Sequence, residues 1–247
     1  MERERTTNTS ERTEALISLL TGFRVVDLSH TLEEGMPVWP ALPKYYHNLW
    51  YSIHLGDHAT SCQLQLSEHT GTHVDAPGHF LPTGHPHHKW VDEVVLATWM
   101  GRAAVVTCRD IPAASAVPPS TVLQWESEHG PIRPGDLVLF DFGWASKWAV
   151  RPEDLEFLRS WPGLAVETAQ LLVERGARAV GVDTLSPDVF GNTGDPIHRL
   201  LLGHGVVIIE NLCNLELLPP VCFVVALPLK VKGGTGSPVR AMALVPE

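Results

Sequence analysis

One segment, residues 69–80, constrains this chain more than any other: His-Thr-Gly-Thr-His-Val-Asp-Ala-Pro-Gly-His-Phe. Imidazole nitrogens and carboxylate oxygens are the ligands that zinc, manganese and similar divalent ions take in proteins. In an extended segment, side chains two and four residues apart share a face, which puts His69, His73 and Asp75 on one side. The glycine and the proline inside the segment argue against a long helix. The spacing therefore predicts a metal site, rather than unrelated histidines of an exposed loop.

Two other stretches carry no comparable pattern. His85, His87 and His88 stand among prolines and glycines with no carboxylate in the run, which is typical of a solvated loop; the rim of a pocket is the alternative. The glycine-rich stretch 232–238 lacks the Gly-Lys-Ser/Thr ending of a phosphate-binding loop, so we interpret it as a hairpin or pocket loop. The four cysteines form no Cys-x-x-Cys pair, which predicts buried thiols in a reducing compartment.

Composition bounds the class of protein. The chain has 247 residues, enough for one large core, and no linker-like stretch divides it. We expect a flexible segment with a short helix over residues 1–22, followed by one domain over residues 23–247. The formal net charge is −10 and no run is rich in lysine or arginine, which disfavours nucleic acid and anionic membranes as partners. The charged N-terminal stretch has no apolar run of signal-peptide or membrane-spanning length, so we expect a cytoplasmic protein.

The pattern along the chain is typical of a mixed α/β fold. Residues 1–9 are expected to fray, and Ser10 is expected to cap a short helix that runs through Leu20. The clearest helix is predicted at Val166–Arg175, because apolar residues recur there at helical spacing between two glycines. Apolar and alternating runs predict strands at residues 24–28, 50–55, 60–66, 103–108, 136–142, 177–183, 206–210, 222–229 and 239–245.

A second group of polar residues begins where the predicted strand 177–183 ends. Asp183 and Asp188 stand at the carboxyl end of that strand, where α/β proteins place their functional groups. His198 follows, and Glu210 ends another apolar strand, where a carboxylate is costly to bury unless it is paired or bound to a metal. Two interpretations stay open for His198 and Glu210. They are ligands of the same or a second ion, or they are a helix cap and an exposed strand end.

The 69–80 segment, together with several others, resembles the metal-dependent cyclase-like hydrolase family, whose members include arylformamidases and isatin hydrolases. Its pattern His-x-Gly-Thr-His-x-Asp-x-Pro-x-His-Phe is similar to the signature of that family. The likeness extends over most of the chain, through the segments 27–30, 36–40, 136–144 and 198–212. After Trp39 and Pro40 the chain departs from many members, because Ala41-Leu42-Pro43 stands in place of Gly-Asp in the loop expected to shape the pocket.

The resemblance implies a fold and a set of site residues. The fold is an α/β single domain of the swivelling β/β/α type, with a mixed sheet and flanking helices. His69, His73 and Asp75 are implied to bind one metal ion. In the two-metal members, Asp75 is implied to bridge to a second ion that His198 and Glu210 hold. The resemblance also implies a homodimer or homotetramer with substrate pockets near the subunit contacts.

The chemistry of such a site points to hydrolysis. A divalent ion lowers the pKa of bound water and polarises a carbonyl group. His79 follows the expected ligands closely and has a pKa range suited to moving a proton onto a leaving nitrogen; the resemblance gives it the same role of general acid and base. Asp183 and Asp188 are expected to orient ligand histidines.

Three tryptophans are candidates to line a flat aromatic pocket: Trp39, Trp90 and Trp144. Ordinary core packing is the alternative interpretation for each of them.

We therefore expect a metal-dependent amidohydrolase that uses one or two Zn²⁺ or Mn²⁺ ions. Its small-molecule substrate is expected to be an aromatic amide, either an aryl-formamide or a cyclic amide such as isatin. Two alternatives stay open: a metal-dependent lyase or dehydratase with His79 as the base, and a non-catalytic metal- or ligand-binding module. The chain has no Gly-x-Ser-x-Gly sequence, which disfavours a serine hydrolase.

Overall fold

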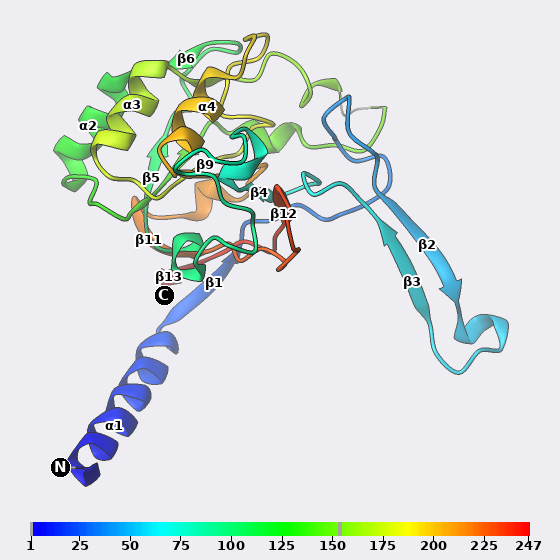
Figure 1. Ribbon diagram of the computed structural model, residues 1–247, viewed down its shortest axis with the longest axis horizontal. Helices are drawn as coiled ribbons and strands as arrows, with labels where there is room; N and C mark the ends of the chain where they lie inside the picture. The colour runs from blue at the N-terminus through cyan, green and yellow to red at the C-terminus, as the bar shows by residue number, and fades with distance from the viewer. Residues whose placement is uncertain (1, 153–154) are drawn as a thin grey trace.

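The computed structural model describes the backbone of residues 2–152 and 155–247, with side chains from residue 10 onward in these ranges. A nine-stranded mixed sheet forms its centre (Figure 1). From one edge to the other its strands are β1 (Phe23–Asp27), β13 (Met242–Pro246), β11 (Val221–Val225), β5 (Met100–Thr107), β7 (Leu137–Asp141), β9 (Ala179–Val182), β10 (Val207–Glu210), β4 (His73–Asp75) and β12 (Gly236–Pro238). The fold is a single mixed α/β arrangement, which confirms the predicted fold class.

The middle of the sheet consists of parallel strands. β5, β7, β9 and β10 pair in parallel, in that order. Every residue of β7, β9 and β10 is buried. Parallel strands covered on both faces are expected to be continuously apolar, and β7 and β9 follow this rule apart from the acid that ends β7. The exception in β10 is its last residue, Glu210, which is buried as well.

Two hydrophobic clusters cover the two faces of the sheet. The helices α2 (Pro119–His129), α3 (Val166–Glu174) and α4 (Pro196–Gly203) lie together over one face (Figure 1). Phe140 of β7 belongs to the cluster under these helices, whereas the adjacent Leu139 belongs to the cluster on the opposite face. This alternation is what the pleat of a strand requires. The edge formed by β10, β4 and β12 is where the polar residues gather.

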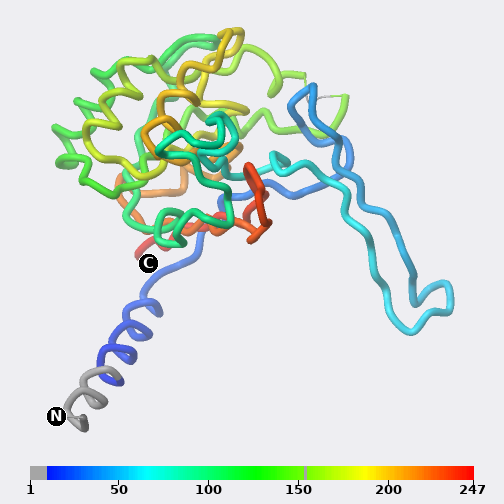
Figure 2. Tube along the Cα trace, in the orientation of Figure 1, coloured from blue at the N-terminus to red at the C-terminus, as the bar shows by residue number. Residues whose placement is uncertain are grey.

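Two elements project from this body. The helix α1 (Glu2–Leu20) and the hairpin of β2 (Tyr46–Tyr51) and β3 (Ser61–Gln65) extend away from the sheet in different directions (Figures 1 and 2). All six residues of β2 are exposed. A further short pair, β6 (Ala116–Val117) and β8 (Gly163–Leu164), lies near the helices. None of the helices in the described part of the chain is long and apolar enough to span a membrane.

Most of the predicted elements are confirmed with their ends shifted by a few residues. These are the strands at 24–28, 60–66, 103–108, 136–142, 177–183 and 206–210 and the helix at 166–175. The four cysteines are free, and three of them are buried. The expectations of fraying over residues 1–9 and of a domain boundary after residue 22 stay predictions.

Other boundaries were predicted wrongly. The strand expected at 50–55 ends at Tyr51, because Ser52 caps a short 3₁₀ turn by accepting a hydrogen bond from the His54 amide. The strand expected at 222–229 ends at Val225, and the one expected at 239–245 begins at Met242. Ser10 does not begin a helix, since α1 already starts at Glu2. Helices α2 and α4 and strands β4 and β12 were not predicted, because α2 has only a weak apolar periodicity and the other three elements are short.

Candidate metal centre

Strand β4 carries His73 and Asp75, and the neighbouring strand β10 places Glu210 beside them. β4 pairs with β10 in an antiparallel register that sets His73 opposite Glu210. Side chains directly opposite share a face, and His73 Nε2 lies 3.2 Å from Glu210 Oε2. Asp75 is two residues further along β4, so its side chain points to the same face, with Oδ1 3.6 Å from His73 Nε2. His73 Nδ1 donates to the Gly71 carbonyl at 2.8 Å, which leaves Nε2 for the two carboxylates.

The first turn of α4 supplies His198. Asp188 accepts hydrogen bonds from the backbone amides of Ile197 at 2.8 Å and His198 at 3.2 Å, and thereby caps this helix. The same carboxylate lies 2.6 Å from His198 Nδ1. The other ring nitrogen, Nε2, therefore faces Asp75 Oδ2 at 3.4 Å and Glu210 Oε1 at 3.1 Å. Asp188 orients His198 from behind, which is the arrangement expected for a residue that supports a ligand.

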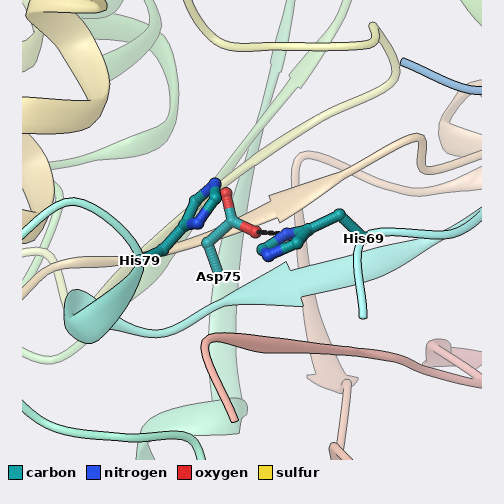
Figure 3. A group of neighbouring side chains, drawn as sticks. All are labelled: His69, Asp75 and His79. Atoms are coloured by element: carbon teal, nitrogen blue, oxygen red, sulfur yellow. Dashed lines mark hydrogen bonds and ion pairs between the residues drawn. The ribbon is translucent and has the colours of Figure 1, made fainter. Parts of the chain in front are cut away.

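Two more histidines, His69 and His79, lie beside the Asp75 carboxylate (Figure 3). His69 Nδ1 lies 2.7 Å from Asp75 Oδ1, and His69 Nε2 lies 3.0 Å from Thr235 Oγ1. The ring of His79 stacks on the ring of His69, with 4.0 Å between their centroids. The Asp75 carboxylate thus lies close to His69 and His79 as well as to the group formed by His73, His198 and Glu210.

The donor atoms form two groups suited to a cation. In each group the atoms lie within 4.8 Å of one another, and Asp75 belongs to both; the groups are His69, Asp75 and His79, and His73, Asp75 and Glu210. Imidazole nitrogens with carboxylate oxygens suit a zinc or manganese ion. Apart from the 3.1 Å ion pair with His198 Nε2, the buried Oε1 of Glu210 has no hydrogen-bond partner among the described residues, which fits an acceptor that a cation would satisfy. The residues present therefore fit a divalent ion.

The grouping differs in one respect from the predicted ligand sets. His69 and His73, expected to hold one ion with Asp75, fall into different groups of donor atoms, and His79 joins His69. Both ring nitrogens of His69 are already hydrogen-bonded, whereas those of His73 and His198 that face the carboxylates are engaged only with Asp75 and Glu210. The assignment of each residue to an ion stays a prediction.

Charges in this cluster are strongly coupled. Burial alone would raise the pKa of Asp75, but hydrogen bonds from His198 and His69 hold it well below its usual value. Burial would lower the pKa of His198, yet its contacts with Asp188, Asp75 and Glu210 raise it well above the usual value. His79 is exposed at the pocket, although the protein around its ring lowers its pKa through desolvation. The Asp75 carboxylate is thus kept ionised in a buried site, because hydrogen bonds and positive charge from the neighbouring histidines offset the cost of its burial.

A pocket of about 270 Å³ opens above the cluster. Its floor consists of the histidines and carboxylates already described, together with Asn211. Its wall is apolar and is formed by Pro37, Val38, Trp39, Ala41, Leu42, Phe80 and Leu185. Trp39 therefore lies where the sequence predicted, with its ring packed edge-on against Trp161 at 6.1 Å.

Trp90 and Trp144 lie elsewhere, among neither the floor nor the wall residues. Trp144 is buried in the core and donates from Nε1 to the Phe157 carbonyl at 3.0 Å. Trp90 packs under the turn that carries His79, where a Cβ on Gly78 would lie 2.7 Å from its ring. The alternative interpretation, ordinary packing, fits both of these tryptophans. His85, His87 and His88 also lie outside the pocket lining, in a turn-rich loop.

Asp183 does not orient a ligand histidine, so that expectation is wrong. Its carboxylate accepts hydrogen bonds from the backbone amides of Phe142 at 3.0 Å and Trp144 at 2.7 Å. Burial raises the pKa of this carboxyl to about 7. Asp183 thus stabilises the loop after β7 and has no contact with the cluster among the hydrogen bonds of the described residues.

The glycine-rich stretch 232–238 supports the cluster, and this role was not predicted from the sequence. Thr235 lies beside His69, and its hydroxyl donates a hydrogen bond to Glu68 Oε2 at 2.6 Å, which holds the threonine in this position. A Cβ on Gly236 would lie 2.6 Å from Cε1 of His69 and 2.5 Å from the Val74 carbonyl oxygen. Only a glycine allows this close approach between β12 and β4. The stretch therefore packs against the cluster through β12, although none of its residues lines the pocket, and the density of glycines was its one visible signal.

These features define a class: a mixed α/β domain with a histidine–carboxylate cluster of metal-ligand type at one edge of its sheet. The chain belongs to the cyclase family, whose model, described as "Putative cyclase", matches residues 26–189. His198 and Glu210 lie beyond the matched stretch, so only the geometry joins them to the cluster.

Known proteins resemble the chain over nearly all its length. A kynurenine formamidase of Salinibacter ruber is 32% identical, over 88% of this chain and 96% of its own. The solved structure of isatin hydrolase A from Labrenzia aggregata, bound to benzyl benzoate, is 30% identical; it superposes with a TM-score of 0.84 and covers 97% of this chain and 100% of its own. A structure described as a potential metal-dependent hydrolase with cyclase activity has a TM-score of 0.71 at 25% identity, over 91% and 99% of the two chains.

Proposed function

We propose that this protein is a metal-dependent hydrolase that cleaves the carbon–nitrogen bond of a small aromatic amide. The substrate is an aryl-formamide or a cyclic amide such as isatin. One observation carries the proposal: Asp75 lies between two groups of metal-type donors at the floor of an apolar pocket. The relatives support the bond type, since one is a kynurenine formamidase and another an isatin hydrolase.

Each polar residue of the floor has a part in this proposal. His69, His73, Asp75, His198 and Glu210 would hold one or two Zn²⁺ or Mn²⁺ ions, with Asp75 shared between the two groups of donors. When bound, such an ion lowers the pKa of a water molecule and polarises the substrate carbonyl. The closely spaced carboxylates and the histidines facing them supply the negative charge and the nitrogen donors that this requires.

His79 acts as the general acid and base. Its ring is stacked on His69 yet exposed to the pocket, so it can reach both the attacking water and the substrate. Desolvation lowers its pKa and keeps the imidazole neutral near pH 7, in the form that accepts a proton. It then delivers that proton to the nitrogen of the breaking carbon–nitrogen bond, which lets the amine leave.

The test combines metal analysis with turnover. We expect protein purified without chelator to contain about one or two equivalents of a divalent ion, and to open isatin or deformylate N-formylkynurenine with one oxygen from ¹⁸O-labelled water in the product. His79→Ala is expected to keep its metal and to lose about 10²–10⁴-fold in turnover. A product without solvent oxygen would point to a lyase instead. Metal-free protein, or full turnover by the His79 variant, would overturn the proposal.

We also propose that the protein forms a homodimer or homotetramer through its projecting elements. The β2–β3 hairpin exposes large apolar side chains, including Leu49, Trp50 and Leu55, and α1 exposes Leu16 and Leu19. An isolated two-stranded hairpin is marginally stable in water, and a lone helix of this length is too. A second copy of this chain offers the same apolar side chains as a self-complementary cover. Sedimentation that shows a monomer at micromolar concentration would contradict this.

A further inference from the structure

The pocket contains one carboxylate that the buried cluster does not use. Asp195 lies at the N-terminal end of α4, lines the pocket and is half-buried. His198 follows three residues later on α4, and both residues line the pocket. Asp195 thus stands above the floor, where it would meet a part of the substrate remote from the breaking bond.

The carboxylate of Asp195 has no structural task. An aspartate before a helix normally accepts hydrogen bonds from the second and third backbone amides. Here Asp188 already takes both of those amides, from Ile197 and His198, and Asp195 makes no capping bond with its side chain. Asp188 therefore leaves the carboxylate of Asp195 free to face a ligand.

The nearest positive side chain on the same helix is engaged elsewhere. Arg199 donates from Nε to the Gly194 carbonyl at 2.9 Å, and its guanidinium lies 5.4 Å from the centre of the Phe80 ring. Within the described ranges of the chain, Asp195 forms no ion pair with it or with any other residue. No lysine or arginine is found among the described residues that line the pocket.

The backbone at Asp195 is also unusual. Its φ of 49° and ψ of 57° lie in the left-handed region, which residues other than glycine, asparagine and aspartate rarely adopt. Conformations of this kind persist where the surroundings require them, and they gather at ligand sites. The turn directs Asp195 to the pocket at a cost in backbone energy that no hydrogen bond of its side chain offsets.

We propose that Asp195 determines substrate specificity by charge, a proposal that rests on the amidase function above. It selects aromatic amides whose ring carries a cationic or hydrogen-bond-donating substituent, and it rejects those whose ring carries a carboxylate. Water and salt screen a charge poorly against an apolar wall, so a like charge on the ligand is repelled and an ammonium group is paired. Anionic amides are therefore poor ligands of this pocket.

The test uses three formanilides of one shape, with an aminomethyl, a methyl or a carboxylate substituent on the ring. Calorimetry with the metal-loaded protein gives their dissociation constants, and turnover is measured separately. For the wild type we expect affinity and kcat/KM to fall in that order. In Asp195→Asn, the preference for the aminomethyl over the carboxylate compound is expected to shrink about tenfold, because one full charge is removed. Asp195→Gly provides a second variant, since both residues tolerate the left-handed backbone.

Asp110→Asn is the matched control. It removes one exposed carboxylate away from this pocket and should leave the substrate ratio unchanged. Equal binding of the three compounds by the wild type, no binding of any, or a ratio that survives both Asp195 variants would overturn the inference. If the ratio of dissociation constants responds to Asp195 but none of the compounds is hydrolysed, the inference stands and the amidase proposal fails. If all three compounds are hydrolysed and the ratio of their dissociation constants is the same in the wild type and the Asp195 variants, the amidase proposal stands and the inference about Asp195 fails.

Discussion

The buried cluster at the sheet edge and the projecting β2–β3 hairpin reverse the usual placement of side chains. In the cluster, Asp75 is 1% exposed and Glu210 is 5% exposed, and each meets imidazole nitrogens of the same chain. In the hairpin, Trp50 is 72% exposed and Leu55 is 77% exposed. Buried charge is tolerated because partners lie within 2.7–3.6 Å. Exposed apolar surface of this size has no such partner within the described part of the chain.

This difference teaches what each region needs. The cluster is complete within one chain except for the cation that its donors fit, so its integrity depends on close packing. The hairpin depends on something outside the chain, because apolar surface exposed to water is costly and marks interaction sites. Variants of the cluster should therefore affect the metal and turnover, whereas variants of the hairpin should affect assembly.

The largest effect is expected from one added methyl group beside the cluster. In Gly236→Ala the new Cβ would collide with the His69 ring and with the Val74 carbonyl, so β12 and β4 must separate. We expect kcat/KM to fall by about a hundredfold or more, with loss of bound metal, because small misplacements of reacting groups cost that much. Metal analysis and turnover measure this. Gly203→Ala, where nothing lies within 4 Å, is the control. A fully active Gly236 variant would show that the close fit is not required.

The next effect should appear in the hairpin and leave the cluster alone. Trp50→Glu puts a charge on the surface proposed to bind a second copy. A buried tryptophan contributes about 2 kcal/mol or more to an interface, so self-association should weaken roughly thirtyfold. Analytical ultracentrifugation measures it, and Asn48→Gln, a polar exchange on the same strand, is the control. If Trp50→Glu lowered the metal content and left assembly unchanged, the proposed division between a hairpin that governs assembly and a cluster that governs metal binding would be wrong.

A smaller effect is expected from the residue that supports His198. Asp188→Asn keeps an oxygen for the Ile197 amide but replaces the oxygen that accepts from the His198 amide and from His198 Nδ1. Loss of such support typically lowers metal affinity about tenfold to a hundredfold, and we expect the lower figure because the shape is kept. Metal titration by calorimetry measures the change. Glu167→Gln, an exposed acid on α3, should bind metal like the wild type.

The smallest effect on metal binding and on assembly is expected at Asp183, where the change appears in the pH dependence of stability. The pKa of Asp183 rises from 3.8 to about 7 on folding, because burial disfavours its charged form. Between these values the folded protein keeps a proton that the unfolded chain releases, so this group makes stability fall as pH rises from about 4 to about 7 and has a constant effect above that range. In Asp183→Asn the slope of unfolding free energy should lose up to about 1.4 kcal/mol per pH unit.

Urea unfolding at pH 5, 6 and 7 measures that slope, with Asp110→Asn as an exposed control. An unchanged slope in the Asp183 variant would mean that its backbone hydrogen bonds, and not burial, govern its ionisation.

Local pattern was enough for part of this molecule. The strands β5, β7 and β9 follow from their apolar runs, and the helix α3 follows from its repeating apolar face. Strands of three residues, such as β4 and β12, have no period to detect, and they became visible only through their pairing. The same reason explains why two interpretations stayed open for Trp39, which lines the pocket, and for Trp90 and Trp144, which are not among its lining residues. All three are aromatic in the sequence, but packing alone decides which tryptophan faces a pocket.

The sequence by itself determined the kind of chemistry, because the ligand-type residues of the 69–80 segment stand close together on the chain and need only one extended turn to converge. Only the tertiary structure decided that His198 and Glu210 join them, because these residues reach Asp75 through the pairing of β10 with β4 and the cap that Asp188 places on α4. Tertiary structure also left Asp195 free and the hairpin exposed. Contacts between distant residues depend on how strands pair and helices pack, which no local spacing records.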